Sequence, residues 1–363
     1  MGFAAFSYLI QDGLSRALQG LAIAGFAVVA QPQVGAADLL SSRPSEAAIR
    51  AATAACLPGR STPPRNIVGI SDPHTLDRRV IDLIAETGVR WVRAEFHWSQ
   101  IQGGGTGGYD WAAYDRMVRA FSDRGIKVAA ILTYIPRDLQ DWGAIDAGFT
   151  AFAEAAVARY APRGVHVWEV FNEPNLTGYG WLEKRDRPAD YLGAYALLLA
   201  RANAAVRRHD PQGVVVIGGL AGAGHRPLSP EQTMQELYAL GVKPCFDVMA
   251  YHPYGYQSRF AEARARVDAI LAQHGDQAKP VWFNEYGWTD YREMSLQVNS
   301  SEHTNPMIAT FAQRGAAEAL FWFSARDYSG RRSAPTFGLA DHEFNKRDSF
   351  ETFRMIIEHI HGQ

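Results

Sequence analysis

The sequence has little of what marks several common protein classes. Its 363 residues contain only two cysteines, Cys56 and Cys245, too few for a disulfide scaffold. One bridge between them and two reduced, packed thiols are both compatible with the sequence. The formal net charge is -2 and no long basic stretch occurs, so we expect no nucleic-acid partner. Neither a G-x-S-x-G nor an H-E-x-x-H motif is present, which leaves serine-hydrolase and zinc-protease chemistry without support.

The chain also lacks a long apolar segment. The run at residues 21–30 is too short to span a bilayer, which needs ~20 apolar residues, so we expect no stable membrane insertion. Arg16 precedes this run and small residues follow it at 34–36, an order typical of a secretory signal peptide. We therefore predict a signal peptide at residues 1–36 and a secreted or periplasmic protein. A helical or disordered N-terminal extension is the alternative.

The sequence does contain alternating β-like and helical segments. Residues 37–64, rich in Ser, Ala, Pro and Arg, are expected to be a leader into one catalytic domain at residues 65–363. In that domain, short apolar runs alternate with amphipathic stretches such as residues 111–121. This alternation predicts parallel strands with crossover helices, and eight units predict a single (β/α)8 TIM barrel. The candidate strands are Asn66–Ile70, Val89–Ala94, Val128–Tyr134, Val165–Phe171, Val214–Gly218, Phe246–Tyr251, Val281–Asn284 and Ala319–Ser324.

Two of these strands run into the same dipeptide. The fourth continues into Asn172-Glu173 and the seventh ends at Asn284-Glu285. Barrel enzymes carry their chemistry at the C-terminal ends of strands, so two such glutamates can face each other across the barrel mouth. Glycoside hydrolysis uses a pair of carboxyl groups in this arrangement, one as acid and one as nucleophile or base. The pattern therefore predicts Glu173 and Glu285 as the catalytic pair.

The motifs around these glutamates resemble clan A of the glycoside hydrolases. The runs WEVFNEPN and WFNEYGW carry the resemblance, supported by VRAEFHWSQIQ, HPYG and LFWFSARD. Within the clan, the sequence is closest in appearance to family 39 and related bacterial polysaccharide hydrolases. The resemblance covers residues 66–356 and implies a retaining mechanism, with Glu173 as acid/base and Glu285 as nucleophile.

The resemblance also implies roles for neighbouring residues. Arg93 would lie near Glu285 and keep it ionised, and Tyr254 would donate a hydrogen bond to the same carboxylate. Asn172 would bind the sugar 2-hydroxyl. Trp322 would form the hydrophobic floor beneath the sugar. For Arg93 the alternative is a structural ion pair, and for the two aromatic residues it is core packing.

Other side chains near strand ends allow two interpretations. His252 belongs to the site or only orients a loop. Trp98 and Trp288 stack on sugars or cap the barrel core. Glu169 is expected to be structural, pointing into the barrel or a helix interface.

The predicted activity is retaining hydrolysis of an oligo- or polysaccharide through a glycosyl-enzyme intermediate, with no cofactor and no metal. A transglycosylase with the same residues is one alternative, and a non-catalytic carbohydrate-binding barrel is another. The presence of both carboxylates argues against the non-catalytic alternative. The sequence determines neither the sugar nor the oligomeric state.

Overall fold

A computed structural model describes most of the chain from residue 43 onward. The described residues are 43–103, 108–139, 141–176, 188–222, 228–254, 259–289, 304–328 and 336–362. The predicted signal peptide at residues 1–36 lies outside them. Among the described residues, none of the helices has the length and apolarity needed to cross a membrane.

Nine parallel strands form one sheet in the order β5-β4-β3-β2-β1-β9-β8-β7-β6. Most strand residues are buried, in keeping with the near-continuous apolar character of the predicted strands. The strands are β1 Ile67–Ser71, β2 Trp91–His97, β3 Lys127–Thr133, β4 Val167–Val170, β5 Val214–Ile217, β6 Leu220–Ala221, β7 Met249–His252, β8 Val281–Tyr286 and β9 Ala319–Phe323.

Strands β5 and β6 are two halves of one barrel strand, separated by Gly218 and Gly219. The first half pairs with β4 and the second with β7. A backbone hydrogen bond from Ile217 to Val248 (3.2 Å) links β5 to the residue just before β7 and closes the ring. The sheet thus has eight barrel positions, and the predicted (β/α)8 fold is confirmed.

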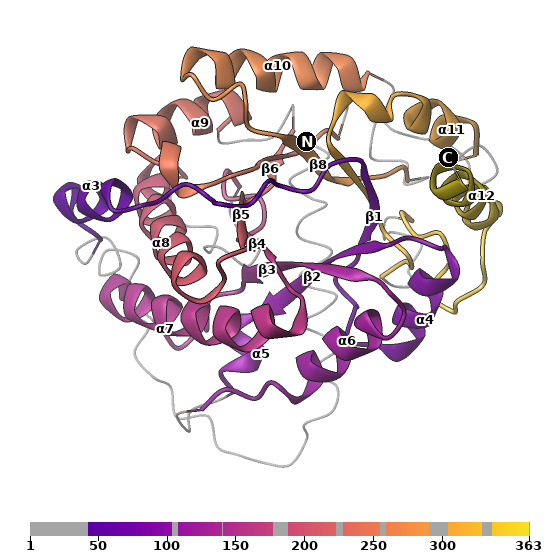
Figure 1. Ribbon diagram of the computed structural model, residues 1–363, viewed down its shortest axis with the longest axis horizontal. Helices are drawn as coiled ribbons and strands as arrows, with labels where there is room; N and C mark the ends of the chain where they lie inside the picture. Colours follow the sequence, from indigo (N-terminus) through magenta and orange to yellow (C-terminus); the bar gives the residue numbers. More distant parts are fainter. Residues whose placement is uncertain are drawn as a thin grey trace, which may run out of the picture.

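Helices surround the strands (Figure 1). In α6, Tyr114, Met117, Val118 and Phe121 are buried, and their spacing places one apolar stripe against the barrel. The α-helices are α3 Glu46–Ala54, α4 Arg78–Glu86, α5 Trp98–Ile101, α6 Ala112–Ser122, α7 Trp142–Tyr160, α8 Pro188–His209, α9 Pro230–Ala239, α10 Phe260–Gln273, α11 Thr304–Ala312 and α12 Asp348–Gly362. Short 3-10 helices lie at η1 Ala161–Arg163, η2 Lys243–Cys245 and η4 Arg314–Ala316.

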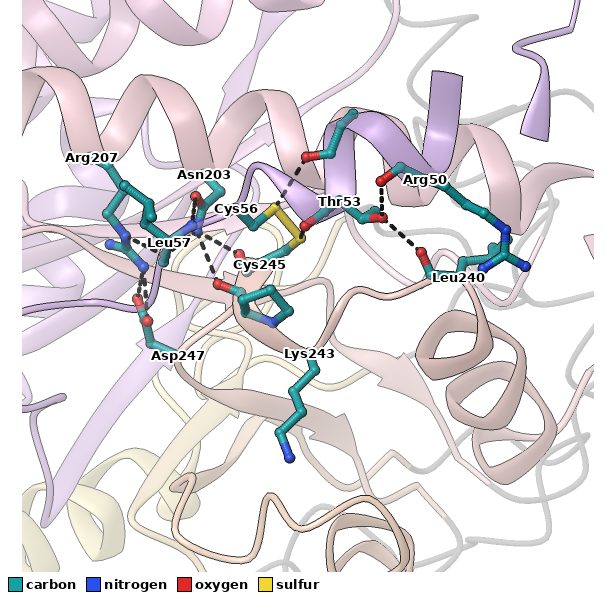
Figure 2. The surroundings of a disulfide bond; sticks show 12 residues. Arg50, Thr53, Cys56, Leu57, Asn203, Arg207, Leu240, Lys243, Cys245 and Asp247 are labelled. Carbon is teal, nitrogen blue, oxygen red and sulfur yellow. Dashed lines mark hydrogen bonds and ion pairs between the residues drawn. A yellow bond between two sulfur atoms is a disulfide. The ribbon is translucent and has the colours of Figure 1, made fainter. Parts of the chain in front are cut away.

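Part of the predicted leader is folded onto the barrel. Helix α3 packs against α8, and Cys56, just after α3, forms a disulfide with Cys245 of η2 (Figure 2). The next residue, Leu57, is held at both its backbone N–H and its carbonyl by the buried amide of Asn203. Of the two alternatives that the sequence allowed for the cysteines, the structure has the bridge.

Candidate active site

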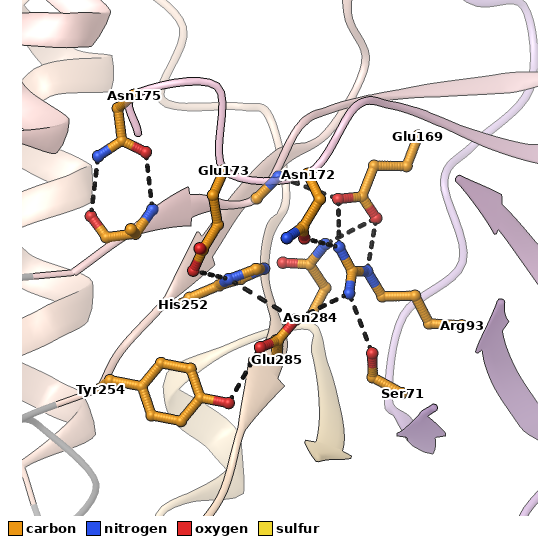
Figure 3. A network of polar contacts seen from close by, with 12 residues as sticks. Ser71, Arg93, Glu169, Asn172, Glu173, Asn175, His252, Tyr254, Asn284 and Glu285 are labelled. Carbon is orange, nitrogen blue, oxygen red and sulfur yellow. Dashed lines mark hydrogen bonds and ion pairs between the residues drawn. The ribbon is translucent and has the colours of Figure 1, made fainter. Parts of the chain in front are cut away.

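The strand ends bring five polar side chains together at the C-terminal face of the barrel (Figure 3). Arg93 extends from β2, Glu169 from β4, His252 from β7 and Glu285 from β8. Glu173 follows β4 in a turn with a φ of 46°, in the left-handed region that non-glycine residues rarely adopt. The site therefore includes locally strained backbone, which often occurs where a side chain is aimed at a functional position.

The two predicted catalytic carboxyl groups face each other. One oxygen of Glu173, one oxygen of Glu285 and a ring nitrogen of His252 all lie within 4.8 Å of one another. Nδ1 of His252 is 2.9 Å from Oε1 of Glu173. The hydroxyl of Tyr254 donates to Oε1 of Glu285 (3.1 Å), and Nη1 of Arg93 donates to its Oε2 (3.1 Å). The glutamates thus have different partners, which gives them different proton affinities.

Beneath this pair, Arg93 and Glu169 form a fully buried ion pair. Nε and Nη2 of Arg93 donate to the two carboxylate oxygens of Glu169, at 2.7 and 2.8 Å. The same carboxylate accepts hydrogen bonds from the backbone of Gly219 (3.0 Å) and the amide of Asn284 (2.9 Å). Nη2 of Arg93 also reaches Oδ1 of Asn172, at 2.7 Å. Of the two positions expected for Glu169, the barrel interior and a helix interface, the structure has the barrel interior.

Burial raises the pKa of both catalytic carboxyl groups. For Glu173 the pKa lies well above its ordinary value, because the group is desolvated and because Glu285 repels its charge. Burial raises the pKa of Glu285 to about 7, although Arg93 and the Tyr254 hydrogen bond oppose this rise. With two donors holding its ionised form, Glu285 ionises first and Glu173 keeps its proton.

Gly219 allows these groups to lie so close together. A Cβ atom at this position would be 2.1 Å from Nε2 of His252 and 2.8 Å from Oδ1 of Asn284. Both contacts are shorter than atoms tolerate, so only glycine fits between β5 and β6 here. The interruption of this barrel strand therefore makes room for the imidazole that contacts Glu173.

The arrangement of Glu173, His252 and Glu285 also meets the geometric requirement for a cation site. A carboxylate–imidazole set of this kind suits a divalent transition metal. Nδ1 of His252 is already engaged by Glu173, however, and acid/base chemistry between two carboxyl groups needs no metal.

Comparison with known families gives a match over residues 57–327 to the family described as cellulase, glycosyl hydrolase family 5. The chain belongs to glycosyl hydrolase family 5. The description of this family names glycosyl hydrolases. No curated protein matches the chain in sequence.

Solved structures of related enzymes share the barrel. A family 39 glycoside hydrolase from Bacteroides cellulosilyticus WH2 is 18% identical with a TM-score of 0.63, over 81% of this chain and 64% of that one. A monomeric β-xylosidase from Caulobacter crescentus CB15 is 19% identical (TM-score 0.60, 82% and 70% of the two chains). A family 1 β-glucosidase from Thermotoga maritima is 15% identical (TM-score 0.58, 82% and 98%). The chain thus spans less than two thirds of the family 39 enzyme. Together with the family match, these structural similarities confirm the expected resemblance to clan A.

Several of the predicted contacts are present in this family 5 chain. Arg93 and Tyr254 both contact Glu285, as expected. His252 lies in the site, fully buried against Glu173. Asn172 accepts a hydrogen bond from Arg93 through Oδ1, which orients its amide; its contact with a sugar hydroxyl stays a prediction.

Two predicted sugar-contacting tryptophans are corrected by the structure. Trp98 is fully buried, its ring stacks 5.8 Å from that of Phe152, and its indole N–H donates to Gln102. Trp322 is also fully buried and lies 6.2 Å from Phe353 of α12, between the barrel and its helical layer. Both therefore pack in the core, the alternative interpretation of such residues, and neither lines the site.

Trp288 follows β8 and is 9% exposed. Its contact with substrate stays a prediction.

The sequence did not reveal which aromatic side chain of β9 points away from the helical layer. Side chains alternate along a strand, so Phe323 points to the opposite side from Trp322. The ring of Phe323 lies 5.6 Å from that of Phe337, which in turn lies 5.7 Å from that of Tyr254. The alternation of side chains along β9 predicts the direction of Phe323 only when the direction of Trp322 is already known.

The contacts of a cluster of charged and aromatic side chains on and beside β2 were not predicted. Glu95 follows Arg93 by two residues and so shares its face of the strand. Its carboxylate contacts the ring of His97 (2.8 Å), and the ring of Tyr134 stacks on that imidazole at 3.7 Å. The i, i+2, i+4 spacing of Arg93, Glu95 and His97 was the available signal.

Proposed function

We propose that the chain is a retaining glycoside hydrolase with Glu285 as nucleophile and Glu173 as general acid/base. The observation that carries this proposal is the separation of the two carboxyl groups, whose nearest oxygens lie within 4.8 Å. Retaining enzymes hold their carboxyl groups ~5–5.5 Å apart, whereas inverting enzymes leave ~6.5–9.5 Å for a water molecule. The short separation favours direct attack on the sugar.

In the first step, ionised Glu285 attacks the anomeric carbon while Glu173 transfers its proton to the leaving glycosidic oxygen. The C–O bond to the leaving group breaks and an ester bond to Glu285 forms. In the second step, Glu173, now ionised, removes a proton from water, and the water oxygen replaces Glu285 at the anomeric carbon. The negative charge of Glu285 disappears in the intermediate, which removes the repulsion that kept Glu173 protonated.

The substrate class follows from the enzymes that share this barrel. They include a β-xylosidase and a β-glucosidase by name. Oligo- or polysaccharides of β-linked xylosyl or glucosyl units are therefore the substrates that we propose. Asn172, oriented by Arg93, is the proposed donor to the 2-hydroxyl of the sugar.

We also propose that the enzyme is exported from the cytoplasm. The disulfide between Cys56 and Cys245 is of a kind that persists in oxidising compartments. The apolar run at residues 21–30 supports the same proposal. Fractionation of producing cells tests it: retention of the full-length chain in the cytoplasm would contradict export.

The proposed mechanism is tested by product stereochemistry and by Glu285→Gln. Proton NMR of the first sugar released from aryl β-xylosides and aryl β-glucosides should show retained configuration. Glu285→Gln should lose activity by orders of magnitude while the protein stays folded. Glu262→Gln, which alters an exposed glutamate on α10, is the matched control and should leave activity intact. An inverted first product, or a fully active Glu285→Gln variant, would refute the mechanism.

A further inference from the structure

Glu169 is a buried carboxylate that the two catalytic steps do not use. Its side chain is 3% exposed, and its hydrogen-bond partners belong to the site or lie directly beside it. It accepts four hydrogen bonds: two from Arg93, one from Gly219 and one from Asn284. A carboxylate that accepts hydrogen bonds from four donors is held in one orientation.

These contacts determine how Arg93 meets the nucleophile (Figure 3). The guanidinium gives Nε and Nη2 to Glu169, so only Nη1 remains to reach Glu285, at 3.1 Å. Nη1 is shared further with the hydroxyl of Ser71, at 3.0 Å. The geometry therefore assigns the stronger, two-pronged ion pair to Glu169 and the weaker, single contact to Glu285.

The positive charge of Arg93 is also balanced mainly by Glu169 rather than by Glu285. Arg93 and Glu169 together carry no net charge, so Glu285 faces a neutral pair rather than an unopposed cation. A nucleophile in double displacement needs an intermediate basicity, because it must attack as an anion and then leave the sugar. An unopposed guanidinium at this distance would stabilise the anion strongly and weaken its attack.

We propose that Glu169 is a positioning residue that sets the strength of the nucleophile through Arg93. It fixes the guanidinium with a single nitrogen directed at Glu285 and another at Asn172, and it offsets the positive charge that Glu285 would otherwise experience. This inference rests on the proposed function, since it assigns Glu285 as the nucleophile.

The electrostatic surroundings of Glu285 support this division. Burial raises its pKa, Arg93 and Tyr254 lower it, and Glu95 and Glu169 raise it again. Within the described part of the chain, the titratable and charged groups around Glu285 are Arg93 and Glu95 on β2, Glu169 on β4, Glu173 after β4, His252 on β7, Tyr254 after β7 and Tyr328 after β9. Of these, only Glu169 binds Arg93 in a two-pronged pair.

The test is a direct titration of Glu285 that needs no turnover. Full-length protein with 13C-labelled glutamate side chains is prepared in the Glu173→Gln background, so that Glu285 titrates without its partner. The Glu285 signal is assigned by its loss in a Glu285→Gln variant. Adding Glu169→Gln should lower the pKa of Glu285 by about one, a tenfold weaker proton affinity, because Arg93 is then unopposed.

A second variant and a control keep the result interpretable. Glu169→Asp retains the charge but retracts it from Arg93, and should give a smaller decrease; it serves if Glu169→Gln does not fold. Asp247→Asn removes the charge of another buried carboxylate, which pairs with Arg207 away from the site, and should leave the titration unchanged. A Glu285 titration that is unchanged or moves upward in both Glu169 variants overturns the proposal. So does an equal change in the Asp247 variant.

Kinetics then connect the titration to the reaction. In the otherwise wild-type chain, Glu169→Gln should move the acidic limb of the pH profile of kcat/KM toward lower pH, a change that a merely structural role would not produce. A wild-type chain without glycosidase activity would refute the proposed function but leave the titration result standing. The two failures are therefore distinguishable.

Discussion

Removal of the Tyr254 hydroxyl should weaken the enzyme only on the acidic side of its pH profile. Tyr254 is 6% exposed and donates a 3.1 Å hydrogen bond to Oε1 of Glu285. A hydrogen bond to a charged group contributes about 1.5 kcal/mol at the low end of its range. Since 1.36 kcal/mol corresponds to one pKa unit, Tyr254→Phe should raise the pKa of Glu285 from about 7 to about 8.

The consequence for activity has a definite sign. The nucleophile must be ionised, so a higher pKa removes active enzyme as the pH falls. At about pH 6 the ionised fraction of Glu285 would drop about tenfold, whereas near pH 9 most of it stays ionised in both proteins. The ratio of kcat/KM between Tyr254→Phe and wild type should therefore be about 0.1 at the acidic end and rise toward 1 at the alkaline end.

The assay is kcat/KM for an aryl β-glycoside, measured at intervals across this pH range for both proteins. Tyr238→Phe is the matched control, because Tyr238 also donates to a buried carboxylate, that of Asp276, but outside the site. It should lower stability without altering the acidic limb. A loss of activity in Tyr254→Phe that is the same at every pH would refute the reasoning.

Three further predictions concern stability and packing. Replacing Cys56 and Cys245 by serine should lower the free energy of unfolding by about 5 kcal/mol, because the bridge restricts the unfolded chain between two residues that are 189 positions apart. A urea unfolding curve that matches that of the wild type would contradict this. Gly219→Ala should displace His252 and lower kcat, with a loss of thermal stability; wild-type kcat would show that the contact is relieved elsewhere. Glu173→Gln should raise the melting temperature near pH 8. The pKa of Glu173 is higher in the folded than in the unfolded protein, so this carboxyl group destabilises the fold at any pH above its unfolded-state pKa of about 4.3. The gain should shrink as the pH falls toward that value, and calorimetry at several pH values checks the trend.

The barrel was predictable because its strands are continuously apolar and regularly spaced. A strand buried on both faces has this pattern, and all eight candidate strands are present in the structure. The positions of Glu173 and Glu285 followed, since both come where an apolar strand ends. A short polar segment that directly follows such a strand lies at the C-terminal mouth of the barrel.

Side-chain direction was harder to predict. Trp98 and Trp322 lie close to strand ends, yet both point toward the helical layer, whereas Phe323 points the other way. A continuously apolar strand does not reveal which residues face the barrel and which face the helices. That choice is made by packing with helices that are distant in the sequence, such as the contact between Trp322 and Phe353 of α12.

The apolar strands, the barrel and the positions of the two glutamates could be predicted from the sequence, because they depend on residues that are neighbours along the chain. The folded structure was needed to show that Arg93 is shared between Glu169 and Glu285, that Gly219 makes room for His252, and that two cysteines 189 residues apart are bonded. Each of these depends on distances between strands or helices that meet only when the barrel closes. The proton affinities of the catalytic pair arise from the same closure, since burial and the neighbouring charges exist only in the folded protein.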